Sequence, residues 1–218
     1  IDRDQTQKAC ADDLKNQYGE RFKFYNKKFS DLSLLTNKKE NIRAIIFDLG
    51  FSLMQVKDLE RGFSFDSKAP LDMRMGINQF SAYDVLNKLN QKQISDILKY
   101  FGDEKDHRKI AFRIEKIRKN KKISHTNDLF QIIKDIKKTK HLIKKNVATK
   151  SFQAIRIFVN NEVTEIIKGL CEATKILNSG GILIIVSFHS LEDRIVKYFF
   201  KTYSEKDKNP SRYLPKID

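Results

Sequence analysis

The stretch that decides the fold is residues 48–76, DLGFSLMQVKDLERGFSFDSKAPLDMRMG, which follow the apolar run AIIF at residues 44–47. Four apolar residues that end in an acid and soon a glycine are typical of a buried parallel strand whose carboxyl end leads into a loop. Ligands gather at that edge in open α/β sheets. The sequence therefore predicts that Asp48 lies at a ligand-binding edge of a sheet.

The residues after Gly50 predict an ordered functional loop. The segment has too many glycines, charges and aromatic residues for a helix with one apolar face, and too many apolar residues for a solvated linker. Charge-assisted hydrogen bonds between neighbouring residues could fix it. The candidate pairs are Glu60 with Arg61, Asp66 with Lys68, and Asp72 with Arg74. An ordinary surface loop held by ion pairs is the alternative.

The same stretch resembles the signature of the MraW family, the bacterial small-subunit rRNA cytosine-N4 methyltransferases. Residues 48–55 match the pattern D-L-G-x-S-S-x-Q, except that Leu53 stands where the family usually has a second serine. Residues 60–65 match E-R-G-F-S-F, and residues 70–75 match P-L-D-M-R-M. The resemblance implies methyl transfer from S-adenosylmethionine to the exocyclic N4 of a cytidine in small-subunit rRNA.

Three further segments carry the resemblance. The chain opens with I-D-R-D, as the family does before a proline, and residues 187–197 match S-F-H-S-L-E-D-R-x-V-K in full. Residues 146–156, NVATKSFQAIR, resemble H-P-A-T-R-T-F-Q-A-x-R; Asn146 and Val147 replace His and Pro, Ser151 replaces Thr, and Lys150 keeps the positive charge of the Arg. A match of the length found at residues 48–76 is far more specific than a lone glycine motif.

The resemblance implies cofactor contacts by Asp2, Phe29, Asp48 and Gln55. A helix-terminal acid is the alternative for Asp2, and a core aromatic for Phe29. The amine of cytosine is a poor nucleophile, so the site must hold it in line with the methyl group and accept its proton. Asp48 and His189 are the candidate catalytic residues, because a strand end would place each at the cleft. His189 could instead simply satisfy backbone groups.

A methyltransferase of this type needs a glycine-rich turn after its first strand, where backbone N–H groups approach the cofactor carboxylate. The earliest of the eight glycines is Gly19, and the chain does not open with methionine. We therefore expect a fragment that begins beyond this turn. The alternative is an RNA-binding methyltransferase-like protein without catalytic activity. A nicotinamide-dinucleotide enzyme with Asp2 on the ribose is disfavoured, because no G-x-G-x-x-G is present.

The charge predicts a polyanionic partner. The 43 Lys and Arg residues against 28 Asp and Glu residues give a net charge of +15, which favours nucleic acid or an anionic surface. Residues 105–145 hold 15 basic residues over a helical apolar period, so they predict a folded basic unit that follows phosphates. A solvated lysine-rich face is the alternative. The predicted RNA contacts are Arg74, Lys116, Arg118, Lys119, Lys121, Lys122, Lys150, Arg156 and Arg194.

The predicted fold class is α/β, an incomplete Rossmann-like class I methyltransferase core with an inserted basic helical subdomain. Residues 1–71 and 148–218 would form the core, and residues 72–147 the RNA-binding insertion. Strands are predicted at residues 21–29, 44–47 and 182–186. Residues 155–177 predict one helix. Gly102 is expected to stop another helix, and capping boxes are expected at Ser81 with Asp84 and at Ser190 with Asp193.

Other classes find little support. The two cysteines have no metal-ligand spacing, the histidines 107, 125 and 141 are scattered, and no metal is expected. No apolar run approaches the roughly 20 residues of a membrane span, and the chain start lacks a signal peptide pattern. We expect a cytoplasmic protein that acts on small-subunit rRNA or the assembled subunit.

Overall fold

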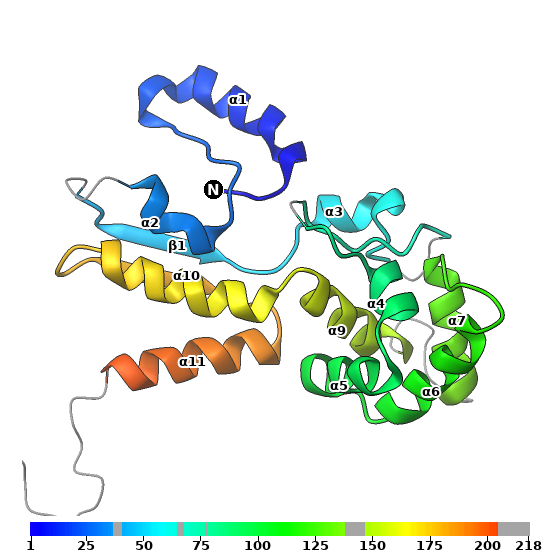
Figure 1. The fold of residues 1–218 in the computed structure, drawn as a ribbon. Coiled ribbons are helices and arrows are strands. Elements are labelled where there is room, and N and C mark those ends of the chain that lie inside the picture. Colours follow the sequence, from blue (N-terminus) through cyan, green and yellow to red (C-terminus); the bar gives the residue numbers. More distant parts are fainter. Residues whose placement is uncertain (37–40, 65–67, 77, 138–146, 205–218) are drawn as a thin grey trace, which may run out of the picture. The chain divides into compact units, whose positions relative to one another are not determined.

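The computed structural model describes residues 1–36, 41–64, 68–76, 78–137 and 147–204 (Figure 1). The chain divides into two compact units, which are described separately. The first comprises Ile1–Phe29 and Phe51–Glu162, and the second comprises Ser30–Gly50 and Val163–Asp218. No helix among the described residues is both long and apolar enough to cross a membrane.

The second unit is built on two parallel strands. Strand β1 (Ala44–Asp48) pairs with β2 (Ile182–Val186) in a register that sets Asp48 opposite Val186. Ile45 and Phe47 are buried on one face, whereas Ile46 is exposed on the other. The two strands and their parallel pairing confirm the prediction from the apolar runs, but the expected burial was wrong for Ile46 and for β2, in which Ile182 is 60% exposed. Within the described residues the sheet has these two strands, so the α/β class is confirmed and the larger Rossmann-like sheet stays a prediction.

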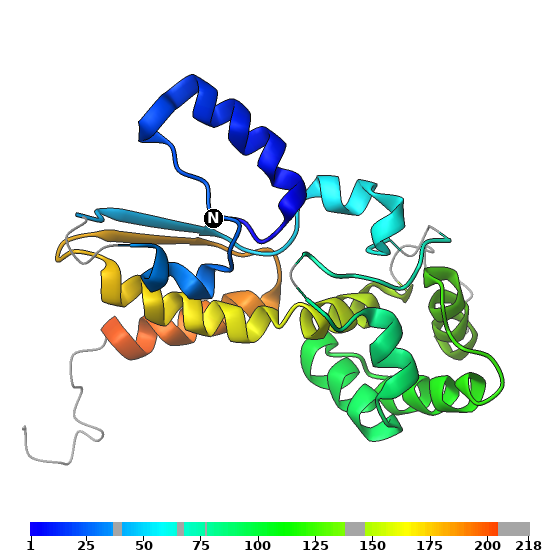
Figure 2. The ribbon, with the colours of Figure 1, turned by 45° about the horizontal axis from the view of Figure 1, so that its top comes forward.

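Helices flank these strands in the second unit. Helices α10 and α11 run alongside the sheet in both views (Figures 1 and 2), and their inward residues include Leu170 and Phe199. A short helix precedes β1. The bounds are α2 (Leu32–Leu35), α10 (Glu162–Ile176) and α11 (Ser190–Ser204).

The first unit is helical, and its core lies among α4, α5, α6, α7 and α9. Leu86, Ile94, Ile114, Leu129 and Ile155 are all fully buried there, at the spacing that the sequence period predicts. Its helices are α1 (Lys8–Tyr18), α3 (Leu53–Lys57), α4 (Ala82–Lys88), α5 (Gln91–Gly102), α6 (His107–Arg118), α7 (Thr126–Lys137) and α9 (Thr149–Val159).

Capping residues decide where several of these helices begin. Ser81 and Asp84 form the predicted capping box of α4, and Asn90 with Gln93 forms another at α5. A third box, Ser52 with Gln55, starts α3 inside the segment predicted to be a loop. The loop prediction was therefore wrong for five residues, because a box satisfies the free N–H groups of even a short helix.

Glycine at the end of α5 plays a different role from the one predicted. Gly102 is the last helical residue, and Asp103, with φ 48°, takes the left-handed position after it. A β-carbon on Gly102 would overlap the carbonyl oxygen of Lys150 and lie 2.9 Å from the Ala154 Cβ. The glycine therefore permits close approach of α5 and α9 rather than a left-handed turn.

Buried Glu104 ties the ends of three helices together. Its carboxylate forms an ion pair with Lys137 of α7 at 2.7 Å and accepts a hydrogen bond from Ser151 of α9 at 3.0 Å. Lys137 also donates to the carbonyl of Val147. Because Glu104 is 3% exposed, this charge is stabilised by its partners rather than by water.

Two predicted elements were wrong. Residues 22–28 form no strand, because the contact of this segment with another stretch of backbone, the hydrogen bond from the Asp2 N–H to the Tyr25 carbonyl, does not repeat as a ladder among the described residues. The helix expected across residues 155–177 breaks between α9 and α10, where Asn161 has a φ of 52°. Asparagine reaches this conformation at low cost, so the break outweighs the continuing apolar period.

Candidate active site

Asp48 ends β1 at the carboxyl edge of the parallel pair. The register sets it opposite Val186, three residues before His189, and the Leu49 N–H donates to the Val186 carbonyl at 3.0 Å. The two strand ends therefore open at the same edge, as the sequence predicts. The Asp48 side chain is exposed and makes no ion pair or hydrogen bond with the described residues. It is free to accept a proton or a hydrogen bond from a ligand.

His189 is held by the first turn of α11. Its Nδ1 accepts a hydrogen bond from the Glu192 N–H at 3.4 Å, and its Nε2 lies 3.2 Å from the Glu192 carboxylate. The same carboxylate accepts a hydrogen bond from the Phe188 N–H at 2.9 Å. The predicted capping box of Ser190 and Asp193 was wrong, because the helix begins at Ser190 and the residue before it, His189, accepts the Glu192 N–H while the Glu192 carboxylate accepts from Phe188.

Asp4 is the hub of the first unit, and the sequence analysis did not single it out. One carboxylate oxygen accepts hydrogen bonds from the backbone and hydroxyl of Thr6. The other accepts from the Gln55 amide at 2.6 Å and from the Arg61 guanidinium, in a site where Asp4 is 2% exposed. A single carboxylate thus joins the I-D-R-D segment to both following signature segments.

The charge state of Asp4 follows from these partners. Burial raises the pKa of its carboxyl, but the hydrogen bonds from Gln55, Arg61 and Thr6 together outweigh burial and hold the pKa below its ordinary value. Asp4 is therefore ionised at neutral pH. An ionised hub binds Arg61 as an ion pair and Gln55 as a charge-assisted hydrogen bond.

The predicted cofactor residues of the first unit differ in how exposed they are and in how many hydrogen bonds already engage them. Asp2 is exposed, with one carboxylate oxygen accepting the Asp4 N–H at 2.7 Å and the other making no hydrogen bond with the described residues. Phe29 is half-buried at the start of a short 3-10 helix. Gln55 is 7% exposed, and its amide is engaged by Asp4 and by the Ser52 N–H. A direct ligand contact by Gln55 would require its amide to give up a partner.

The loop that contains the signature residues 70–75 is fixed by charged side chains. Asp72 and Arg74 form the predicted pair, with two hydrogen bonds of 2.7 Å. Burial raises the Asp72 pKa, yet its bonds to Arg74 lower it overall, and the same bonds raise the Arg74 pKa. The predicted pairing of Glu60 with Arg61 was wrong, because Arg61 reaches the better-buried Asp4. The pair of Asp66 with Lys68 lies outside the described residues.

Asn160 anchors this loop and was also missed. Its side chain is fully buried, donates to the carbonyls of Met73 and Arg156, and accepts from the Met75 N–H and the Asn78 amide. Met73 has a φ of 58°, which is strained for a residue with a β-carbon. The Met73 N–H donates to the Arg61 carbonyl and the Met73 carbonyl accepts from Asn160, and these two hydrogen bonds hold that conformation. The adjacent asparagines at the helix break were the available sequence signal.

The predicted RNA contacts divide into exposed and engaged side chains. Exposed members are Lys116, Lys119, Lys121, Lys122, Lys150 and Arg194. Two of these also form surface ion pairs, Lys121 with Asp128 at 3.9 Å and Lys150 with Asp103 at 3.6 Å. Arg118 donates to the carbonyl of Leu86, near the end of α4, and pairs with Glu115. Its role there is that of a helix C-cap.

Arg74 and Arg156 are the other engaged members. Arg156 is 7% exposed, forms two hydrogen bonds of 2.8 Å with Glu162, and stacks over the Phe51 ring at 4.3 Å. Arg74 is held by Asp72. RNA contacts by these two guanidinium groups stay predictions, and they would compete with the existing ion pairs.

Comparisons with known proteins assign the family. Residues 1–217 match the model of the MraW methylase family. The chain is similar to "Ribosomal RNA small subunit methyltransferase H" of Rickettsia felis (44% identical, 98% of this chain and 69% of the relative). The proteins of that name from Rickettsia canadensis (44%, 98% and 68%) and Rickettsia prowazekii (42%, 98% and 69%) are also similar. The chain therefore belongs to the MraW methylase family.

Proposed function

We propose that this protein methylates the N4 amine of a cytidine in small-subunit rRNA, using S-adenosylmethionine. Family membership supports methyl transfer, and the names of the relatives support an rRNA substrate. The observation that carries the proposal is Asp48, an exposed carboxylate without a partner among the described residues, at the carboxyl edge of a parallel strand pair. Cytosine N4 is the finer assignment, which the signature at residues 48–76 favours.

We infer, as the family resemblance implies, that two carboxylates contact the cofactor. When bound, S-adenosylmethionine supplies an electrophilic methyl group. Asp2 is fixed through one oxygen by the Asp4 N–H, and its other oxygen can accept a hydrogen bond from a ribose hydroxyl. Asp48 presents a second acceptor. We infer that Phe29 packs on the adenosine, and that Gln55 acts through Asp4 or after releasing it.

The proton of the amine needs an acceptor as the new bond forms. We infer that Asp48 is this acceptor, because its carboxylate is unengaged. His189 is the second candidate, but both its ring nitrogens face Glu192. That geometry favours a positioning role, in which His189 fixes the turn between β2 and α11.

The deciding experiment measures tritium transfer from labelled S-adenosylmethionine to small-subunit RNA. At saturating cofactor, Asp48→Asn should lower the turnover by about 100-fold, within the range of general base catalysis. Asp135→Asn, which alters an exposed acid on α7, is the matched control and should retain full turnover. A normal rate for Asp48→Asn would exclude the proton transfer. RNA binding without any transfer by the unaltered protein would indicate the non-catalytic alternative.

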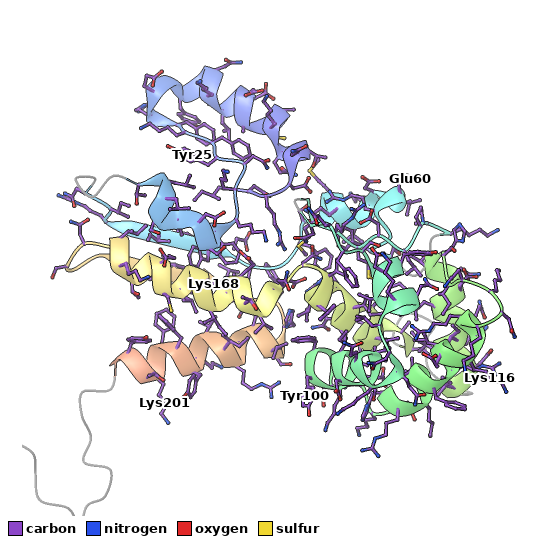
Figure 3. All side chains as sticks on the ribbon, viewed as in Figure 1. Tyr25, Glu60, Tyr100, Lys116, Lys168 and Lys201 are labelled. Atoms are coloured by element: carbon purple, nitrogen blue, oxygen red, sulfur yellow. The ribbon has the colours of Figure 1, made fainter. Side chains whose placement is uncertain are left out.

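We also propose that residues 72–147 are an RNA-binding insertion in a Rossmann-like core formed by residues 1–71 and 148–218. The exposed lysines at positions 116, 119, 121 and 122 support an electrostatic contact. Replacing these four lysines by glutamine should reduce the slope of log affinity against log salt concentration by about 3, because each phosphate contact on a single strand contributes about 0.7. Lys168→Gln and Lys201→Gln, in the second unit (Figure 3), are controls. An unchanged slope would place the RNA surface elsewhere.

A further inference from the structure

The outer face of α6 carries an aromatic ring that the fold does not use. Phe112 is 59% exposed, although the neighbouring Ala111 is fully buried. Ile110 and Ile114 are also fully buried and anchor the opposite side of the helix in the core of the first unit. Among the described residues, Phe112 has no aromatic partner and no cation stacked on it. The ring is thus presented to solvent by a rigid helix.

Cations surround this ring along the helix. Successive helical residues are ~100° apart, so Arg108 and Lys116 lie within about 40° of Phe112, one turn to either side. Lys119 continues the stripe and keeps helical dihedral angles, φ −62° and ψ −33°. Figure 3 shows Lys116 at the outer side of α6. We call Arg108, Phe112, Lys116 and Lys119 the α6 stripe.

The cations of the α6 stripe are available to bind an anionic ligand. Arg108, Lys116 and Lys119 are exposed, and none forms an ion pair with the described residues. In contrast, Lys109 on the same helix pairs with Asp106 at 3.0 Å, and Arg118 with Glu115. The stripe extends over about 16 Å from position 108 to position 119 at 1.5 Å per residue. Its only large apolar group is the ring between the charges.

We propose that the α6 stripe binds an unpaired segment of RNA, with Phe112 stacked on a base and the flanking cations on the adjoining phosphates. Aromatic side chains among cations bind single strands because every base has a flat face and every nucleotide a phosphate. Base pairing and stacking within a duplex cover those faces, so the ring selects single-stranded RNA. The inference rests on the proposed function in one respect, which is that the polyanion bound by the protein is RNA.

The test measures the affinity of the protein for a short single-stranded RNA of mixed sequence and for the duplex of the same RNA. Phe112→Ala should weaken single-strand binding about tenfold, in the range reported for loss of one stacked base, and leave duplex binding within twofold. Phe112→Tyr should restore the single-strand affinity. Arg108→Gln with Lys116→Gln should weaken both RNAs and reduce the salt slope.

Tyr198→Ala is the matched control, because Tyr198 is a 74% exposed aromatic on α11. It should leave both affinities unchanged, and thermal melts should confirm that all variants are folded. Equal losses for single strand and duplex in Phe112→Ala, or no loss for the single strand, would overturn the inference. Methyl transfer by the unaltered protein tests the proposed function separately. If the unaltered protein transfers no methyl group but Phe112→Ala still weakens single-strand binding tenfold, the proposed function is wrong and the RNA-binding role of the α6 stripe is retained.

Discussion

Gly102 of α5 lies against the backbone carbonyl of Lys150 in α9, with no room for a β-carbon between them. Alanine normally stabilises a helix interior by about 1 kcal/mol relative to glycine. Here the overlap should reverse the sign, so Gly102→Ala should lower the free energy of unfolding by about 2 kcal/mol. Urea titration would measure the change. Lys92→Ala, at an exposed site on α5, is the control and should change stability by less than about 0.5 kcal/mol.

Asp4→Asn should destabilise the protein by about 2 kcal/mol at neutral pH, since it removes the charge that pairs with Arg61 and Gln55. It should also weaken S-adenosylmethionine binding in calorimetry, because the Asp4 backbone holds the Asp2 carboxylate. Asp13→Asn, on the exposed face of α1, is the control. Cofactor affinity equal to that of the unaltered protein would show that the Asp4 network is not needed to orient Asp2.

Acid should weaken the protein partly through Asp4. The folded pKa of this group lies below its ordinary value of 3.8. Its contribution to stability is therefore present above about pH 4 and is lost as the pH falls through the lower, folded value. The free energy of unfolding should decline less steeply below pH 4 in Asp4→Asn than in the unaltered protein. If the free energy of unfolding falls equally steeply below pH 4 in the two proteins, this assignment is contradicted.

The ion pair of Glu104 with Lys137 should couple strongly in a double-mutant cycle. Glu104→Gln and Lys137→Met each leave one partner of a buried pair without its opposite charge. Each should cost about 2 kcal/mol, whereas the double variant should cost less than their sum by about 1 kcal/mol. Lys109→Met with Asp106→Asn, an exposed pair on the same unit, is the comparison cycle and should show a coupling near zero. Additive losses at Glu104 and Lys137 would argue against direct interaction.

Asn160→Ala should release the loop that contains Met73 and Met75. The variant removes four hydrogen bonds and leaves the Met75 N–H without its acceptor, which should cost about 3 kcal/mol. Hydrogen exchange at the Met75 amide should accelerate by more than the global loss of stability predicts. Asn120→Ala, an exposed asparagine after α6, is the control. Unchanged protection of Met75 would show that other contacts hold the loop.

The parts of the fold that local pattern specifies could be predicted from the sequence. The runs at residues 44–47 and 182–186 are apolar throughout, and each ends at a polar turn, so their parallel pairing and shared carboxyl edge followed. The capping box at Ser81 and Asp84 could also be predicted, because both residues lie within one helical turn. The pairing of Asp72 with Arg74 joins near neighbours and could be predicted for the same reason.

The partners that lie far apart in the chain could not be predicted. Asp4 meets Arg61 across 57 positions, and Asn160 meets Met75 across 85, so no local spacing encodes either contact. The alternation of Phe22 and Phe24 indicated a strand, yet a strand forms only where another supplies a ladder. His189 kept its expected place at the edge, but its hydrogen bonds with α11 depend on Glu192, which the sequence analysis did not connect with it.

Four arginines, at positions 61, 74, 118 and 156, have guanidinium groups that hold carboxylates within the fold, whereas Lys116, Lys119, Lys121 and Lys122 are exposed to solvent. A guanidinium offers several donors in one plane, which an ammonium cannot reproduce. Exchanging Arg for Lys at these four positions would preserve the net charge and still loosen the scaffold. Exchanging Lys for Arg at the four exposed positions would leave these ion pairs intact. The charge of the exposed surface can therefore change without disturbing the ion pairs that brace the fold.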